Sequence, residues 1–124
     1  MILCDTNVII EALKKNPIVI REIEEIGLER IAVSVVTVME LYYGALNKAE
    51  LKKIKRHLSS ILIFQIDERI SVTATGLIER YAKSHRLQIP DALIAATSIN
   101  RDLQLYTGNK KDFVYIEKIS LWSL

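Results

Sequence analysis

The sequence predicts an α/β domain, a three-layer α/β/α sandwich around a mainly parallel sheet. Short apolar runs such as Met1–Cys4 have the composition of strands that are buried on both faces. Between these runs stand segments with apolar residues at helical spacing, and such alternation is typical of parallel sheets covered by helices. With 124 residues the chain has the size of one domain, and we expect a single unit over 1–124.

Each predicted strand is a short apolar run, and each predicted helix repeats apolar side chains three or four residues apart. In the first half of the chain these elements are the strand Met1–Cys4, a helix over Val8–Leu13, a helix over Pro17–Ile26, a strand at Ile31–Val33, a helix from Ser34 to about Leu46 and a helix over Lys48–Leu58. In the second half they are a strand at Ile61–Phe64, a helix from Asp67 through Tyr81, a helix opened by Pro90-Asp91 that continues from Ala92 to about Asn100, a strand at Leu103–Tyr106 and a candidate fifth strand near Ile119–Leu121.

Residues at the predicted boundaries support these assignments. Thr6 or Asn7 is a suitable N-cap for the first helix, and Ser34 for the third. Asn16-Pro17 opens the second helix, because proline is favoured at the first helical position, and Gly27 ends it. These residues therefore support the predicted starts of the first three helices and the end of the second.

The composition excludes several classes of protein. Half of the residues are hydrophobic and 26% are charged, which suits a packed soluble domain and not a disordered chain. The net charge of +2 is too small to argue for nucleic-acid binding by itself. The single cysteine, Cys4, allows no disulfide within the chain, and His57 and His85 lack the spacing of zinc ligands. No signal peptide or membrane-spanning run is evident, so we expect a cytoplasmic protein.

Acidic residues stand at positions where a parallel sheet builds its functional edge. Asp5 directly follows the first strand, and ligand sites in such sheets lie beyond the carboxyl ends of the strands. Glu40 lies among apolar residues of a predicted helix, which predicts partial burial; Thr37 is placed to orient its carboxylate, and Gly44 leaves space beside it. The alternatives are a helix cap for Asp5 and a solvated side chain for Glu40.

Two further acidic positions complete the candidate cluster. Asp91 falls in the first turn of a helix, where the helix dipole also favours an acid without any catalytic role. Asn109 and Asp112 follow the fourth strand, and either side chain could reach inward, while Asp112 could also cap a turn. Such an oxygen-only ligand set suits Mg²⁺ or Mn²⁺ and not zinc. One or two such ions generate hydroxide and stabilise the charge that develops on a phosphodiester during cleavage.

Four motifs together resemble the PIN-domain family, and most closely its small VapC-type members, the toxin halves of prokaryotic toxin–antitoxin pairs. They are Asp5-Thr6-Asn7, the segment Ser34–Leu41 with Gly44, the segment Pro90–Ala96, and Thr107-x-Asn109-x-x-Asp112-Phe113. The resemblance spans essentially the whole chain in the same order. It implies an endoribonuclease that depends on Mg²⁺ or Mn²⁺, with catalytic and metal-ligand roles for Asp5, Glu40, Asp91 and Asp112.

The fourth acidic position departs from the family's pattern. Many members have aspartate where Asn109 stands, and a neutral amide binds a hard cation less strongly than a carboxylate does. We therefore favour Asp112 as the fourth acid and Asn109 as a helper. Thr6 and Thr107 are placed to hydrogen-bond carboxylates or a substrate phosphate, and Asn7 is a third supporting residue.

The expected partners are RNA, an antitoxin protein and a second copy of the chain. Lys110 and Lys111 are candidate RNA contacts beside the site, and a second basic surface comprises Lys48, Lys52, Lys53, Lys55 and Arg56. The resemblance implies the homodimer and the antitoxin, which in this family occupies the acidic groove. Candidate protein contacts are the hydrophobic residues Ile9, Ile10, Leu13, Tyr42, Tyr43 and Leu46, which serve equally well as core.

Three alternative functions remain at this point. The departure at Asn109 leaves open a catalytically weak or inactive PIN-fold binding module. A receiver-like signalling domain would need an acceptor aspartate after the third strand, where Asp67 comes slightly late, and a lysine after the last. A haloacid-dehalogenase-type phosphatase is disfavoured because Asn7 stands where that family has its second aspartate.

Overall fold

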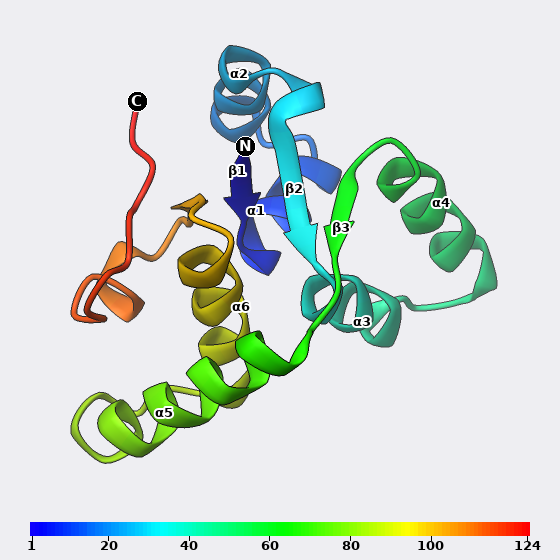
Figure 1. Cartoon of the computed structure of the whole chain (residues 1–124). Helices are drawn as coiled ribbons and strands as arrows, with labels where there is room; N and C mark the ends of the chain where they lie inside the picture. The colour runs from blue at the N-terminus through cyan, green and yellow to red at the C-terminus, as the bar shows by residue number, and fades with distance from the viewer.

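The computed structural model describes residues 1–124 and contains one parallel four-stranded sheet with strand order β3-β2-β1-β4 (Figure 1). The strands are β1 (Ile2–Cys4), β2 (Ile31–Ser34), β3 (Leu62–Phe64) and β4 (Gln104–Tyr106). In the register of the sheet, Leu3 of β1 lies opposite Ala32 of β2 and Leu105 of β4. The first strand of the chain is therefore central, with neighbours on both sides.

Six α-helices and one short 3₁₀ segment lie between the strands, and a second 3₁₀ segment follows the last strand. The helices are α1 (Thr6–Leu13), α2 (Pro17–Ile26), α3 (Val35–Gly44), α4 (Lys48–Leu58), α5 (Glu68–His85) and α6 (Ile89–Asn100), and the 3₁₀ segments are η1 (Leu28–Arg30) and η2 (Lys110–Asp112). No helix combines the length and the apolar character needed to cross a membrane.

Alternate residues of the strands feed two separate cores, one on each face of the sheet. Leu3, Ala32 and Leu105 join a cluster with residues of α5, α6 and the C-terminal segment. Ile2 and Val33 join a second cluster with residues of α1, α2 and α4. The predicted three-layer α/β/α sandwich is thereby confirmed, and Figure 1 shows the two helical layers on either side of the strands.

Several predicted boundaries are wrong in detail. The N-cap of α1 is Asp5, because its side chain accepts a hydrogen bond from the Thr6 amide, whereas Thr6 and Asn7 already lie in the helix. Helix α3 ends at Gly44 because the backbone of Ala45 is extended. Helix α6 begins at Ile89, one residue before the Pro90-Asp91 pair that we expected to open it.

The candidate fifth strand is reduced to a single bridge between Leu105 and Leu121. The amide of Leu105 donates to Ser120 and its carbonyl accepts from Trp122, at 2.8 Å in each case. This segment protects the edge of β4 without extending the sheet.

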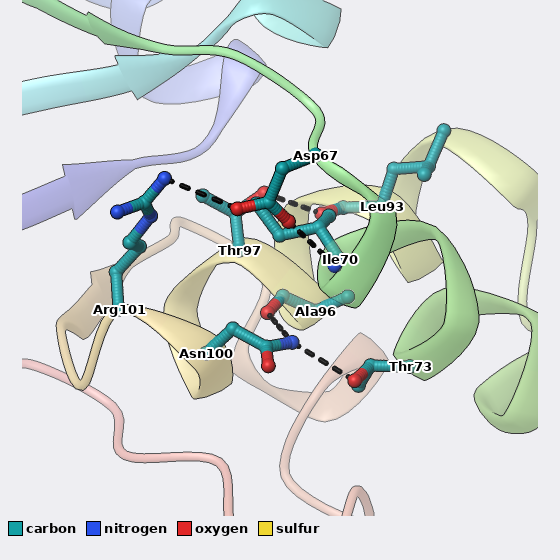
Figure 2. A network of polar contacts seen from close by, with 8 residues as sticks. All are labelled: Asp67, Ile70, Thr73, Leu93, Ala96, Thr97, Asn100 and Arg101. Atoms are coloured by element: carbon teal, nitrogen blue, oxygen red, sulfur yellow. Dashed lines mark hydrogen bonds and ion pairs between the residues drawn. The ribbon is translucent and has the colours of Figure 1, made fainter.

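A polar network fastens α5 to α6, and Figure 2 shows its members. Asp67 caps α5 by accepting from the Ile70 amide at 2.9 Å, and it pairs with Arg101, just beyond α6, at 3.3 Å. The Asn100 amide group donates to the Thr73 hydroxyl and to the Ala96 carbonyl, both at 2.9 Å. These contacts fix the orientation of α6, which carries Asp91 in its first turn.

We expect Asp67→Ala to lower the free energy of unfolding by about 1 kcal/mol, because it removes the cap of α5. Asp67→Asn keeps an acceptor for the Ile70 amide and weakens only the ion pair with Arg101, whose partners are 44% and 46% exposed, so it should cost less than about 0.5 kcal/mol. Arg101→Ala removes the ion pair and also the contact of its guanidinium with the Phe64 ring, at 5.4 Å from the ring centre. Urea denaturation measures the difference, and an equal loss in Asp67→Asn and Asp67→Ala would show that the ion pair and not the cap carries the effect.

Candidate active site

The site is built around Asp5, which follows the central strand β1 and is only 5% exposed. Its carboxylate accepts hydrogen bonds from the Thr6 amide at 2.8 Å and from the Thr107 hydroxyl at 2.9 Å. Thr107 directly follows the neighbouring strand β4, and its hydroxyl accepts from the Asn109 amide at 3.0 Å. Two adjacent strand ends therefore hold this buried charge in one orientation.

Glu40 reaches the same place from α3. The Thr6 hydroxyl donates to Glu40 Oε1 at 2.7 Å, and the hydroxyls of Thr6 and Thr37 are 2.8 Å apart. Since the only proton of the Thr6 hydroxyl points to Glu40, Thr37 is the donor between the two threonines. Thr37 therefore acts through Thr6, and the expectation that it contacts Glu40 directly is wrong.

The expected partial burial of Glu40 is also wrong, because this residue is exposed. A methyl group at Gly44, one turn further along α3, would meet nothing within 4 Å, so this side of the helix is open. Glu40 is a carboxylate at the rim of the site with one buried donor, the Thr6 hydroxyl.

Asp91 and Asp112 complete the acidic group. Asp91 is half-buried in the first turn of α6, and Asp112 is exposed in η2. The side-chain amide of Asn109 donates to Asp112, while its backbone amide supports Thr107. Asn109 thus links the exposed acid to the donor that holds Asp5.

The pKa shifts of Asp5 and Asp91 show that the charges of the four acids act on one another. Burial raises the pKa of Asp5, the hydrogen bonds from Thr107 and Thr6 lower it, and the charges of Glu40 and Asp112 raise it again. Burial raises the pKa of Asp91 to about 6, with further increases from the charges of Asp5, Asp112 and Glu40. No basic side chain relieves this crowding, because the two ion pairs of the structure are Arg80–Glu117 and Arg101–Asp67.

The acids form a loose group as they stand. No three of them lie close enough together to hold one cation among themselves. The exposed positions of Glu40 and Asp112, in contrast to buried Asp5, make these two the members with the most freedom to move inward.

The remaining predicted site residues lie around this group. Asn7 is exposed on α1, and Lys110 and Lys111 are exposed in η2 next to Asp112. The basic residues of α4 are exposed on a separate helix, and Lys53 borders a groove next to Glu40. Sequence reasoning missed Tyr115: after burial, the charges of Asp112 and Asp91 raise the pKa of its phenol, so it borders the site. The only signal in the sequence is an aromatic residue three positions after Asp112.

A known protein family matches almost the whole chain. The sequence model of the PIN domain matches residues 2–119. The chain belongs to the PIN-domain family. This membership excludes the receiver-like alternative, and Asp67, the acid considered for it, is the N-cap of α5.

Relatives of this PIN-domain chain are similar over most of its length. It is 33% identical to a protein named Ribonuclease VapC1 from Methanocaldococcus jannaschii, over 97% of this chain and 84% of the relative. It is 38% identical to Ribonuclease VapC10 from Mycobacterium tuberculosis, over 72% of this chain and 67% of the relative. A solved toxin–antitoxin complex from Klebsiella pneumoniae contains a chain of the same fold, with a TM-score of 0.82, 27% identity and 100% coverage of both chains.

The raised pKa of Asp91 predicts an unusual pH dependence of stability. The folded protein holds this proton up to a pH of about 6, whereas an ordinary aspartate releases it near 3.8. The contribution of Asp91 to stability is therefore greatest below pH 4 and is lost as the pH rises through about 6. In EDTA at pH 7.5, Asp91→Asn should be more stable than the wild type by up to about 3 kcal/mol.

Urea unfolding from pH 4 to pH 8 checks this expectation. The advantage of Asp91→Asn should shrink toward pH 4, whereas Glu79→Gln, at an exposed position of α5, should track the wild type throughout. Parallel curves for Asp91→Asn and the wild type would show that Asp91 is not under electrostatic stress.

Proposed function

We propose that this chain is an endoribonuclease that depends on Mg²⁺ or Mn²⁺ and acts as the toxin of a toxin–antitoxin pair. Its relatives VapC1 and VapC10 are ribonucleases, and a chain of the same fold is part of a toxin–antitoxin complex. The single observation that carries the chemistry is the buried Asp5 carboxylate, which shares its surroundings with three further acids and with no basic partner.

The donor set fits a hard divalent cation. All four candidate ligands, Asp5, Glu40, Asp91 and Asp112, are carboxylates, and their mutual repulsion is what a divalent charge relieves. When bound, the ion supplies hydroxide from water and stabilises the charge that develops on the phosphate. Because no three acids are close enough as they stand, we expect the exposed side chains of Glu40 and Asp112 to turn inward around the more buried Asp5 and Asp91.

The other side chains orient the acids and receive the substrate. Thr107 and the Thr6 amide hold Asp5, and the Thr6 hydroxyl holds Glu40. We assign Asp112 as the fourth acid and Asn109 as its support, because the Asn109 side chain donates to Asp112. Lys110 and Lys111, on the same short segment as Asp112, are placed to contact phosphates of the RNA. The homodimer and the cytoplasmic location stay predictions.

We expect the wild-type protein to cleave RNA in the presence of Mg²⁺ or Mn²⁺, and we expect EDTA to stop this cleavage. Asp5→Asn should fold and lose more than about 100-fold in kcat, because it removes the anchored ligand, whereas the supporting change Thr107→Val should lose roughly 10- to 100-fold. Cleavage of a labelled oligoribonucleotide measures both effects. Thr75→Val, at an exposed position of α5, is the matched control.

Undiminished cleavage by Asp5→Asn would overturn the assignment of the site. RNA binding without cleavage in either metal would favour the inactive binding module. A folded Asp5→Asn protein is established by an unchanged circular-dichroism spectrum.

A groove next to Glu40 is the place where we propose that the antitoxin binds. It has a volume of about 630 Å³ between α1, α3 and α4. The apolar residues of its lining are Ile10, Leu13, Leu41, Leu46, Ala49 and Ile54. Its charged residues are Lys14, Glu40, Glu50 and Lys53, and Gly44 completes the lining. An amphipathic segment fits such a groove, and one placed there can extend to the acids. Of the candidate protein contacts, Ile10, Leu13 and Leu46 line the groove, while Ile9 is core.

Leu46→Asp should weaken antitoxin binding at least about tenfold without changing the fold, because Leu46 lines the groove and is 85% exposed. Tyr43→Asp is the control, since Tyr43 is 94% exposed near the same helix end but does not line the groove. If a small open reading frame lies next to the gene of this protein, its purified product is the partner to test, and calorimetry measures the affinities. Equal affinities of Leu46→Asp and the wild type would place the antitoxin elsewhere.

A further inference from the structure

Three aromatic rings pack together at the C-terminal end of α5. His85 stacks on Tyr115 with ring centroids 3.9 Å apart and planes 7° apart. Tyr81 meets both rings edge-on, at 5.7 Å from His85 and 5.1 Å from Tyr115. The Ser84 hydroxyl lies 2.7 Å from His85 Nδ1 and so restrains the rotation of the imidazole.

The three rings differ in exposure. Tyr81 is buried, Tyr115 is half-buried and His85 is exposed. Tyr115 covers one face of the imidazole, and the exposed side chain of His85 keeps part of the ring accessible to solvent. The imidazole of His85 is thus held in one orientation, by Tyr115 on one face and by the Ser84 hydroxyl at Nδ1.

This stack stands at the border of the acidic group. Tyr115 follows Asp112 by three residues, beyond the buried anchor Phe113. After burial, the charges of Asp112 and then Asp91 raise the pKa of Tyr115, in agreement with this short separation along the chain. The stack therefore stands on the side of the acidic group where Asp112 and Asp91 lie.

Four basic residues lie close to the stacked residues along the chain. Lys83 and Arg86 flank His85 in the chain, and Lys110 and Lys111 directly precede Asp112. All four side chains are exposed, and none takes part in an ion pair. An exposed aromatic ring among unpaired cations is the combination that binds single-stranded nucleic acid, since cations contact the phosphates and the ring stacks on a base.

The stack is not needed to hold the C-terminal segment against α5. The hydroxyl of Tyr81 accepts from the Glu117 amide at 3.2 Å, and Arg80 pairs with the Glu117 carboxylate at 2.7 Å. These contacts fasten the segment independently of His85. A purely structural role for the imidazole is therefore already filled by other residues.

We propose that the His85–Tyr115 stack is a platform for one unpaired base of the RNA substrate, next to the phosphate that is cleaved. The inference rests on the proposed ribonuclease function and adds a contact to the substrate, the residues that hold one of its bases. A stacked base is sequence-tolerant, because every base presents a π-face. The platform therefore selects for an unpaired nucleotide and leaves sequence preference to other contacts.

The test compares His85→Ala and His85→Phe with the wild type on a single-stranded oligoribonucleotide in Mg²⁺ or Mn²⁺. Loss of the ring should raise KM by roughly 5- to 100-fold with little change in kcat, because stacking acts in the ground state and the transition state alike. His85→Phe should restore most of the affinity. His57→Ala is the matched control, since His57 is the other histidine, is exposed on α4 and has no aromatic contact.

A second measurement detects the stacking of a base on His85 in the absence of cleavage. 2-Aminopurine placed at each position around the cleavage site should lose fluorescence on binding at one position in the wild type and in His85→Phe, but not in His85→Ala. The binding is measured in EDTA, with thermal unfolding of each variant as the check on folding.

The outcomes separate the platform from the ribonuclease proposal. If the wild type cleaves RNA and His85→Ala has unchanged KM and unchanged 2-aminopurine quenching, the platform is wrong while the ribonuclease stands. A wild type that cleaves no RNA in either metal would overturn the ribonuclease and the platform together. Weaker antitoxin binding by His85→Ala, with unchanged RNA affinity, would assign this surface to a protein partner and not to RNA.

Discussion

A carboxylate that is 5% exposed at the end of a central strand has to be held by donors, since an unpaired buried charge costs several kcal/mol. Here the donors to Asp5 come from the next residue in the chain and from Thr107, which lies 102 positions later at the end of β4. This pairing ties the first and last strands together at the edge where the chemistry is proposed. It also sets the position against which Glu40, Asp91 and Asp112 are arranged.

The four acids divide into two that are buried or half-buried and two that are exposed. Asp5 lies between packed elements, and Asp91 is fixed by α6, which the network around Asn100 and Asp67 holds against α5. Glu40 and Asp112 are exposed, and each accepts a hydrogen bond from a neighbouring polar side chain. Such a division suits the proposed metal-dependent nuclease, in which the buried acids would define the cation site and the exposed ones would adjust to the cation and the RNA.

Much of this architecture follows from local sequence, because its signals are short-range. Asn16, Ser34 and Asp67 cap helices as side-chain chemistry dictates, and Gly27 ends α2 with a φ of 98° that favours glycine. The errors arose where a residue had two local solutions. Asp5 serves both as site acid and as cap, and the burial of Glu40 depended on what faces it across the open side of α3.

By itself, the sequence determined the alternation of strands and helices, the acids that follow the strands, and the motifs that resemble the PIN-domain family, since these depend on neighbours along the chain. Only the tertiary structure decided that Thr37 acts on Glu40 through Thr6, that Asn109 supports Asp112, and that Tyr115 carries His85 at the border of the site. The reason is physical. Hydrogen bonds and ring stacking act over a few ångströms, and residues far apart in sequence come that close only when the sheet order and the helix packing bring them together.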